Sequence, residues 1–131
     1  MADWPQNTAA TRITSNDQTS NYHYTILTTG ASNVYGAYST CITTTTSQSV
    51  GMSVFVNRLD STDIYNVEIA TGSAGLEYPL WSFFALTASI PEHGGSLYLP
   101  INIPAGTRIA ARAKSGGAGA TIRLSISLAE N

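Results

Sequence analysis

Apolar and polar residues alternate along much of this chain, and the alternation is clearest in its last strand-like run. The apolar positions there are Ile122, Leu124, Ile126 and Leu128, and the residues between them are Arg or Ser. Successive side chains of a strand point to opposite faces, whereas an α-helix would scatter these four around its surface. The pattern predicts a β-strand over residues 121–128 with one face in the core.

From Asn21 onward, such runs alternate with turn signals at intervals of roughly 8 to 14 residues, which is typical of a β-sandwich. The intervening segments are rich in Gly, Pro, Asp and Ser, and Pro-Ala-Gly at 104–106 suits a tight turn. We therefore expect an all-β fold, a single-domain antiparallel β-sandwich of about eight strands, either jelly-roll or immunoglobulin-like. The predicted strands are 22–28, 38–45, 51–57, 64–71, 82–89, 96–103, 107–114 and 121–128.

Three further runs present one apolar face each and supply the rest of the predicted core. Cys41 lies in the strand-like run YSTCITT, where we expect a small buried side chain rather than a reactive thiol. The apolar faces are Met52, Val54 and Val56; Tyr65, Val67 and Ile69; and Leu97, Leu99, Ile101 and Ile103.

The run WSFFALTAS carries aromatic residues on both faces of a predicted strand. Trp81 and Phe83 fall on one face and Phe84 on the other. Both faces could be buried within the domain. Alternatively, one aromatic face lies at a subunit interface or stacks on a sugar.

Residues 1–20 show no sustained period, so we assign an N-terminal arm at 1–20 and a β-sandwich domain at 21–131. The arm is either a disordered tail or an extended, loosely docked segment. In the second case Trp4 and Ile13 would be its apolar contacts with a neighbouring subunit, because Trp is enriched at interfaces.

Composition adds an expectation about association. Hydrophobic residues make up 43% of the chain and charged residues only 11%, against about 25% in a typical domain. With few charges to keep its faces apart, the chain is expected to form a homo-oligomer, and a trimer is the form we favour.

The net charge of −2 gives no overall attraction to phosphate, so nucleic acid is not an expected partner. The chain has neither a signal-peptide pattern nor an apolar run of about 18 residues, and we expect no membrane partner.

Candidate chemistry is sparse. His23 and His93 belong to no metal-binding pattern, and no GxSxG motif is present. Asp60, Asp63 and Glu68 are the densest carboxylates; DSTD at 60–63 favours a turn, with a calcium loop as the alternative. We expect no enzyme activity, no cofactor, no metal and no catalytic residue.

The basic residues are concentrated near the C-terminus. Arg108, Arg112 and Lys114 share one face of a predicted strand, and Arg123 follows on the next strand. They form either a solvated face or a positive stripe that contacts an acidic partner or a glycan. Together with Trp4, these are the candidate binding residues.

A resemblance follows from two longer runs. LYLPINIPAGTRIAARAKS at 97–115, followed by TIRLSISL and preceded by YNVEIATGSAGLE at 65–77, resembles small β-sandwich virion proteins of tailed bacteriophages. The resemblance implies a capsid decoration or cement protein, or a tail-associated protein, that acts as a homo-oligomer. It carries no catalytic signature.

The leading hypothesis is therefore a phage virion structural protein, assembled in the host bacterial cytoplasm, that oligomerises and docks on the capsid. Its partners would be copies of itself and capsid or tail proteins. The alternative is a tail-associated module that binds a receptor or a carbohydrate.

Overall fold

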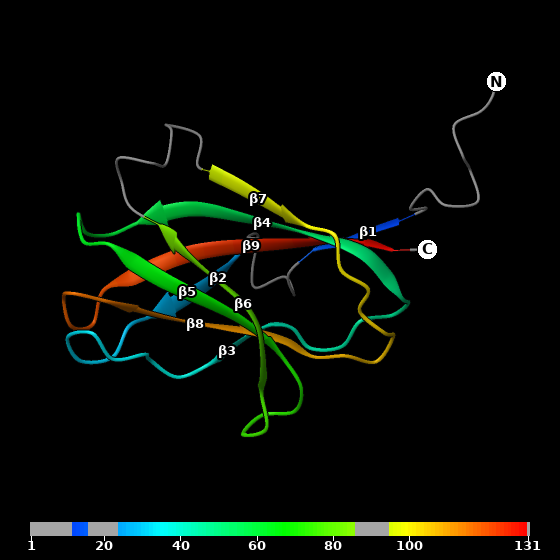
Figure 1. Cartoon of the computed structure of the whole chain (residues 1–131), viewed down its shortest axis with the longest axis horizontal. Helices are drawn as coiled ribbons and strands as arrows, with labels where there is room; N and C mark the ends of the chain where they lie inside the picture. Colours follow the sequence, from blue (N-terminus) through cyan, green and yellow to red (C-terminus); the bar gives the residue numbers. More distant parts are fainter. Residues whose placement is uncertain (1–11, 16–23, 86–94, 131) are drawn as a thin grey trace.

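The computed structural model describes residues 12–15, 24–85 and 95–130. Within these ranges there are nine strands in two antiparallel sheets and no helix, which confirms the predicted all-β sandwich (Figure 1). The described residues include no helix long and apolar enough to cross a membrane. Trp4, His23 and His93 lie outside the described residues.

The first sheet has five strands. Its central strand, β9, pairs with β4 on one edge and with β1 and β2 in succession along the other, and β4 then pairs with β7. The five strands are β1 Arg12–Ser15, β2 Thr25–Thr28, β4 Ser49–Leu59, β7 Gly95–Leu99 and β9 Thr121–Glu130.

The second sheet has four strands in the order β3-β8-β5-β6. Its two central strands, β8 and β5, pair over their whole length, from Thr71 opposite Ile109 to Tyr65 opposite Ser115. The four strands are β3 Ser39–Ile42, β5 Tyr65–Thr71, β6 Tyr78–Ala85 and β8 Ile109–Ser115.

The pairing identifies the sandwich as a jelly roll. With β1 and β2 taken as one interrupted strand, the first strand pairs with the last, β3 with β8, β4 with β7, and β5 with β6. This is a long antiparallel hairpin folded over on itself, the connectivity of the two-sheet jelly roll. Between the described strands from β2 to β9, the chain changes sheets at every step except from β5 to β6.

The core lies between the sheets and consists of the predicted apolar faces. The burial of Cys41 and of the alternating faces of β4, β5 and β9 is confirmed, and each fully buried Leu or Ile contributes roughly 1.5–3 kcal/mol. Buried residues include Cys41, Met52, Val54, Val56, Tyr65, Val67, Ile69, Ile122, Leu124, Ile126 and Leu128.

The predicted strand 96–103 differs from the structure. β7 ends at Leu99, and Leu97 is exposed, whereas Ile103 is buried and bridges to Ser49. The reason is that β7 is an edge strand, so its inward face is only partly covered.

The segment assigned to the N-terminal arm also contributes to the sheet. Residues 12–15 form β1, and Ile13 lies opposite Ala129 of β9. Residues 12–15 therefore pair within the chain's own first sheet, which differs from both forms expected of the arm, a disordered tail and a segment docked on a neighbouring subunit.

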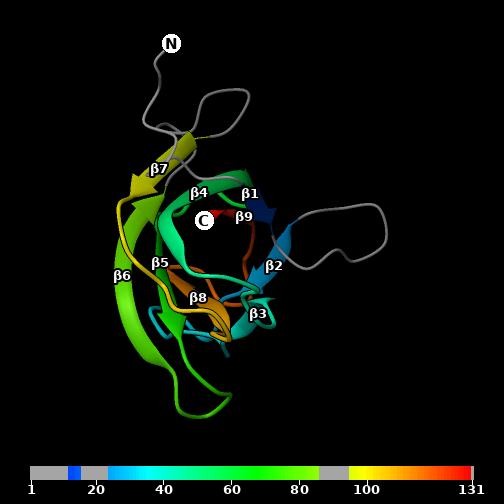
Figure 2. The ribbon, with the colours of Figure 1, turned by 90° about the vertical axis from the view of Figure 1, so that its right-hand side faces the viewer.

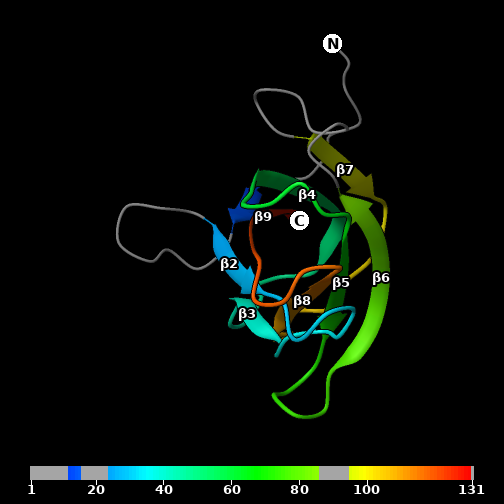
Figure 3. The same cartoon turned by 90° about the vertical axis from the view of Figure 1, so that its left-hand side faces the viewer.

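The two sheets face each other, with β6 and β7 at one side of the sandwich and β2 and β3 at the other (Figures 2 and 3). β6 and β7 are the edge strands of the second and first sheets, respectively. The side chains discussed next lie mainly on the outer face of the second sheet, which faces away from the core.

Candidate functional site on the outer face of the second sheet

The outer face of the second sheet gathers polar side chains in rows, because residues directly opposite each other in antiparallel strands share a face. One row across β6, β5 and β8 is Phe84, Asn66 and Lys114; the next is Ser82, Glu68 and Arg112. Arg108, which immediately precedes β8, lies at the end of the same face beside β3. The structure thus brings together Arg108, Arg112 and Lys114, as expected from their spacing.

Arg123 does not extend this stripe, and the expectation that it would is wrong. It lies on β9 in the first sheet, opposite Ile26 and Arg58, and its guanidinium carbon is 5.0 Å from the centre of the Tyr24 ring. The cause is the jelly-roll connectivity, in which the chain crosses from one sheet to the other between β8 and β9.

A carboxylate near Arg123 balances the local positive charge. Asp60 accepts hydrogen bonds from the Thr121 hydroxyl and from Nε of Arg58, the latter at 2.8 Å. The hydrogen bond from Thr121, followed by the charges of Arg58 and Arg123, lowers the pKa of Asp60 although partial desolvation opposes the change. Asp60 therefore stays ionised at neutral pH.

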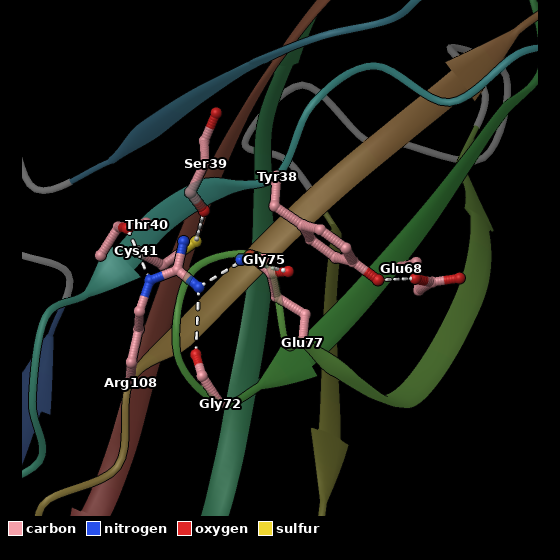
Figure 4. A network of polar contacts seen from close by, with 9 residues as sticks. All are labelled: Tyr38, Ser39, Thr40, Cys41, Glu68, Gly72, Gly75, Glu77 and Arg108. Carbon is pink, nitrogen blue, oxygen red and sulfur yellow. Dashed lines mark hydrogen bonds and ion pairs between the residues drawn. The ribbon is translucent and has the colours of Figure 1, made fainter.

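The middle of the outer face is a closed polar cluster around Glu68. Nε of Arg112 donates to Oε1 of Glu68 at 2.9 Å, and the Tyr38 hydroxyl donates to the same oxygen (Figure 4 shows the contact with Tyr38). The guanidinium carbon of Arg112 lies 4.3 Å from the ring centre of Tyr35 and 4.5 Å from that of Tyr38. Arg112 is thus both neutralised and covered by aromatic rings.

This cluster also perturbs its tyrosines. Burial, followed by the hydrogen bond to Glu68, raises the pKa of Tyr38 to about 12. The pKa of Tyr35 is raised as well, first by burial and then by the charge of Glu68. Burial alone would lower the pKa of Arg112, but its hydrogen bond with Glu68 leaves that pKa raised.

Arg108 closes one end of the sheet with several hydrogen bonds (Figure 4). Its Nη1 donates to Oε2 of Glu77 at 3.0 Å and to the Gly72 carbonyl at 3.1 Å, and its Nε donates to Oγ1 of Thr40 at 2.9 Å. The other oxygen of Glu77 accepts from the Gly75 amide at 3.0 Å. Glu77 is held by its own backbone amide as well, and these bonds together lower its pKa.

Two turns make this arrangement possible. Gly72 has φ +115° and Gly106 has φ +78°, backbone values that residues other than glycine rarely adopt. The Gly106 value confirms the tight turn predicted for Pro-Ala-Gly. Between these turns lies a pocket of about 600 Å³, which Arg108 lines together with Leu80, Ile101 and neutral polar residues. We call this the Arg108 end.

The opposite end of the same sheet has a second depression, of about 500 Å³, which we call the Phe84 end. Phe84, Asn66 and Lys114 line it, with Asp63 at the loop that precedes β5. The Phe84 side chain is 69% exposed. This confirms that the aromatic residues of β6 are divided between its faces, since Trp81 and Phe83 pack against the core.

The sequence indicated the basic residues but missed their partners. Alternation places Glu68 on the polar face of β5, but it does not reveal that β5 pairs with β8, which brings Glu68 opposite Arg112. DSTD forms hydrogen bonds typical of a turn: the Ser61 hydroxyl donates to Asp63 and accepts from its amide. In the described parts of the chain, no three His, Cys, Asp or Glu side chains are grouped to hold a metal ion.

No protein-family model, curated protein or solved structure matches this chain.

Proposed function

We propose that the protein is a structural subunit of a tailed-bacteriophage virion, a homo-oligomer that decorates the capsid. The jelly roll supports this proposal, because it is a common fold of viral capsid proteins. Lectin domains share the fold, so fold alone does not determine function.

The runs that resemble phage virion proteins have a structural role here. The runs 65–77 and 97–115 include the paired strands β5 and β8. Two ion pairs, Glu68 with Arg112 and Glu77 with Arg108, join them across the outer face. Residues that maintain a scaffold, rather than a reaction centre, are what a virion subunit needs.

Exposed apolar side chains along the edge strands β6 and β7 carry the proposal. Leu76, in the hairpin turn before β6, and Tyr78, the first residue of β6, are 79% and 71% exposed, and Leu97 and Tyr98 of β7 are exposed as well. Edge strands also offer unpaired backbone groups, so they are natural sites for association with another chain. A second copy that covers this side would bury these side chains.

Sedimentation velocity of the full chain tests the association. We expect a mass that is a multiple of the chain's own, with the trimer as the specific form proposed. The double variant Tyr78→Ser and Leu97→Ser should shift the protein to monomer, whereas Ile26→Ser, at a half-exposed position on β2, should not. A wild-type monomer at micromolar concentration would contradict the proposal.

Placement on the particle needs a separate experiment. Gold-labelled antibodies against the chain, applied to purified virions of the phage that encodes it, should decorate the head. Signal confined to the tail tip would instead support the alternative, a receptor-binding or carbohydrate-binding module. Absence of signal from the whole particle would refute both virion roles.

A further inference from the structure

Three side chains at the Phe84 end form one row across adjacent strands. Phe84 of β6 lies directly opposite Asn66 of β5, which lies directly opposite Lys114 of β8. Neighbouring strands are about 4.8 Å apart, so the row spans roughly 10 Å, close to the width of one sugar ring with its substituents. An exposed aromatic ring, an amide and a cation thus lie side by side over the depression.

Tyr35 orients the polar part of this row. Its hydroxyl donates to Oδ1 of Asn66 at 2.9 Å, and Nζ of Lys114 lies 4.8 Å from the centre of its ring. With Oδ1 occupied, Asn66 has its amide hydrogens available for a ligand, because Nδ2 makes no hydrogen bond to the described residues.

Lys114 differs from the other two cations on this face. Arg108 and Arg112 each have a glutamate partner, whereas no carboxylate among the described residues pairs with Lys114. The reason is the residue in its row: Glu68 lies opposite Arg112, but the neutral Asn66 lies opposite Lys114. The ammonium group is therefore available for an external anion.

From this geometry we propose that the Phe84 end binds a saccharide, specifically a pyranose unit that carries a carboxylate. The C–H groups of one sugar face stack on the exposed Phe84 ring, because they carry partial positive charge and the ring face is electron-rich. The Asn66 amide donates to ring hydroxyl groups, and Lys114 pairs with the sugar carboxylate.

Asp63 supplies an acceptor at the margin of the site. Ser61 holds one of its carboxylate oxygens at 3.1 Å, and this oxygen would lie only 2.6 Å from a Cβ at Gly117. The Asp63 carboxylate therefore lies against the loop after β8, where it can accept a hydrogen bond from a sugar hydroxyl.

The chemistry at the other end does not favour a sugar. Arg108 donates hydrogen bonds to Thr40, Gly72 and Glu77, and no aromatic side chain is among the residues that line the pocket there. The saccharide site does not depend on virion placement, because binding to the purified chain reports on it alone.

Titration with D-glucuronate and D-glucose, followed by backbone amide NMR shifts of the full chain, tests the site. The two sugars differ only in the carboxylate at carbon 6. Glucuronate should perturb amides around Asp63, Asn66, Phe84 and Lys114, and it should bind more tightly than glucose.

Matched variants separate binding from folding. Phe84→Ala should weaken glucuronate binding about tenfold or more, by analogy with truncation of an aromatic ring that stacks on a nucleobase. Phe55→Ala, at an exposed phenylalanine on the first sheet, should leave binding unchanged. Lys114→Gln should weaken glucuronate about two- to fivefold and leave glucose unaffected. The proposal is overturned if neither sugar shifts these amides, or if Phe84→Ala and Phe55→Ala, both folded, bind alike.

Discussion

Both ends of the second sheet involve β5, β6 and β8, and the Arg108 end involves β3 as well, yet the two ends differ in how their polar groups are satisfied. At the Arg108 end, one guanidinium contacts Glu77, Gly72 and Thr40, and the hairpin between β5 and β6 supplies two of these partners. At the Phe84 end, the ammonium group of Lys114 lies against the Tyr35 ring and pairs with no carboxylate of the described residues, and Phe84 is largely exposed.

Within the sheet, neighbouring rows of side chains differ in the same way: one row is a closed structural contact, and the next is available for a ligand. Both cations of β8 project from the same face, and both lie near Tyr35. What separates them is the opposite residue on β5, Glu68 for Arg112 and Asn66 for Lys114. A carboxylate in the row neutralises the cation, whereas an amide leaves it free for a ligand.

The largest expected effect is on stability, and it contrasts the inner and outer faces of the second sheet at the Phe84 end. Tyr65 is fully buried on the inner face of β5, and Tyr65→Ala should lower the free energy of unfolding by about 3 to 5 kcal/mol through a core cavity. Phe84→Ala removes an exposed ring and should change it by less than about 0.5 kcal/mol. Urea denaturation of both variants measures the contrast, and a large cost for Phe84→Ala would make its ring structural.

The second prediction compares the cations at the two ends. Arg108→Ala removes the donor to the Gly72 carbonyl and the partner of Glu77, so it should cost about 1 to 3 kcal/mol. Lys114→Ala breaks no ion pair with the described residues and should cost less than about 0.5 kcal/mol. Thermal unfolding of the two variants measures both losses of stability. Equal losses would contradict the proposed difference between the two ends.

The third prediction concerns the pH dependence of the Arg108 end. Hydrogen bonds from its own amide, Arg108 and Gly75 lower the pKa of Glu77 below its ordinary 4.5. A lowered carboxyl pKa adds stability that is present above pH 4.5 and is lost as pH falls through the folded pKa. Denaturation at a series of acidic pH values should therefore show that the difference in free energy of unfolding between wild type and Glu77→Gln shrinks as pH falls. Parallel losses in the two proteins would exclude this role for Glu77.

Much of the fold could be predicted from the sequence, because alternation reports which residues face the core. It identified the inner faces of β4, β5 and β9 and the shared face of Arg108, Arg112 and Lys114. It could not assign strands to sheets, since that depends on pairings between residues far apart in the chain. The misplaced Arg123 and the unrecognised Glu68 and Glu77 pairs follow from that limit.

The smallest expected effect lies between the two ends, in the Tyr38 phenol. Burial and the hydrogen bond to Glu68 raise its pKa to about 12, so ultraviolet titration of the wild type should include a tyrosine ionisation near pH 12. A raised phenol pKa adds stability that is complete below pH 10 and is lost as pH rises toward 12. Tyr38→Phe should remove this late transition.

Glu68→Gln separates the two causes of that shift. It removes the carboxylate charge but keeps an acceptor, so the late transition should move down toward 10 without reaching it, because burial remains the larger cause. An unchanged transition in Glu68→Gln would mean that Glu68 does not hold the phenol. The row of Ser82, Glu68 and Arg112 would then be no more closed than the row of Phe84, Asn66 and Lys114, and the contrast between them would fail.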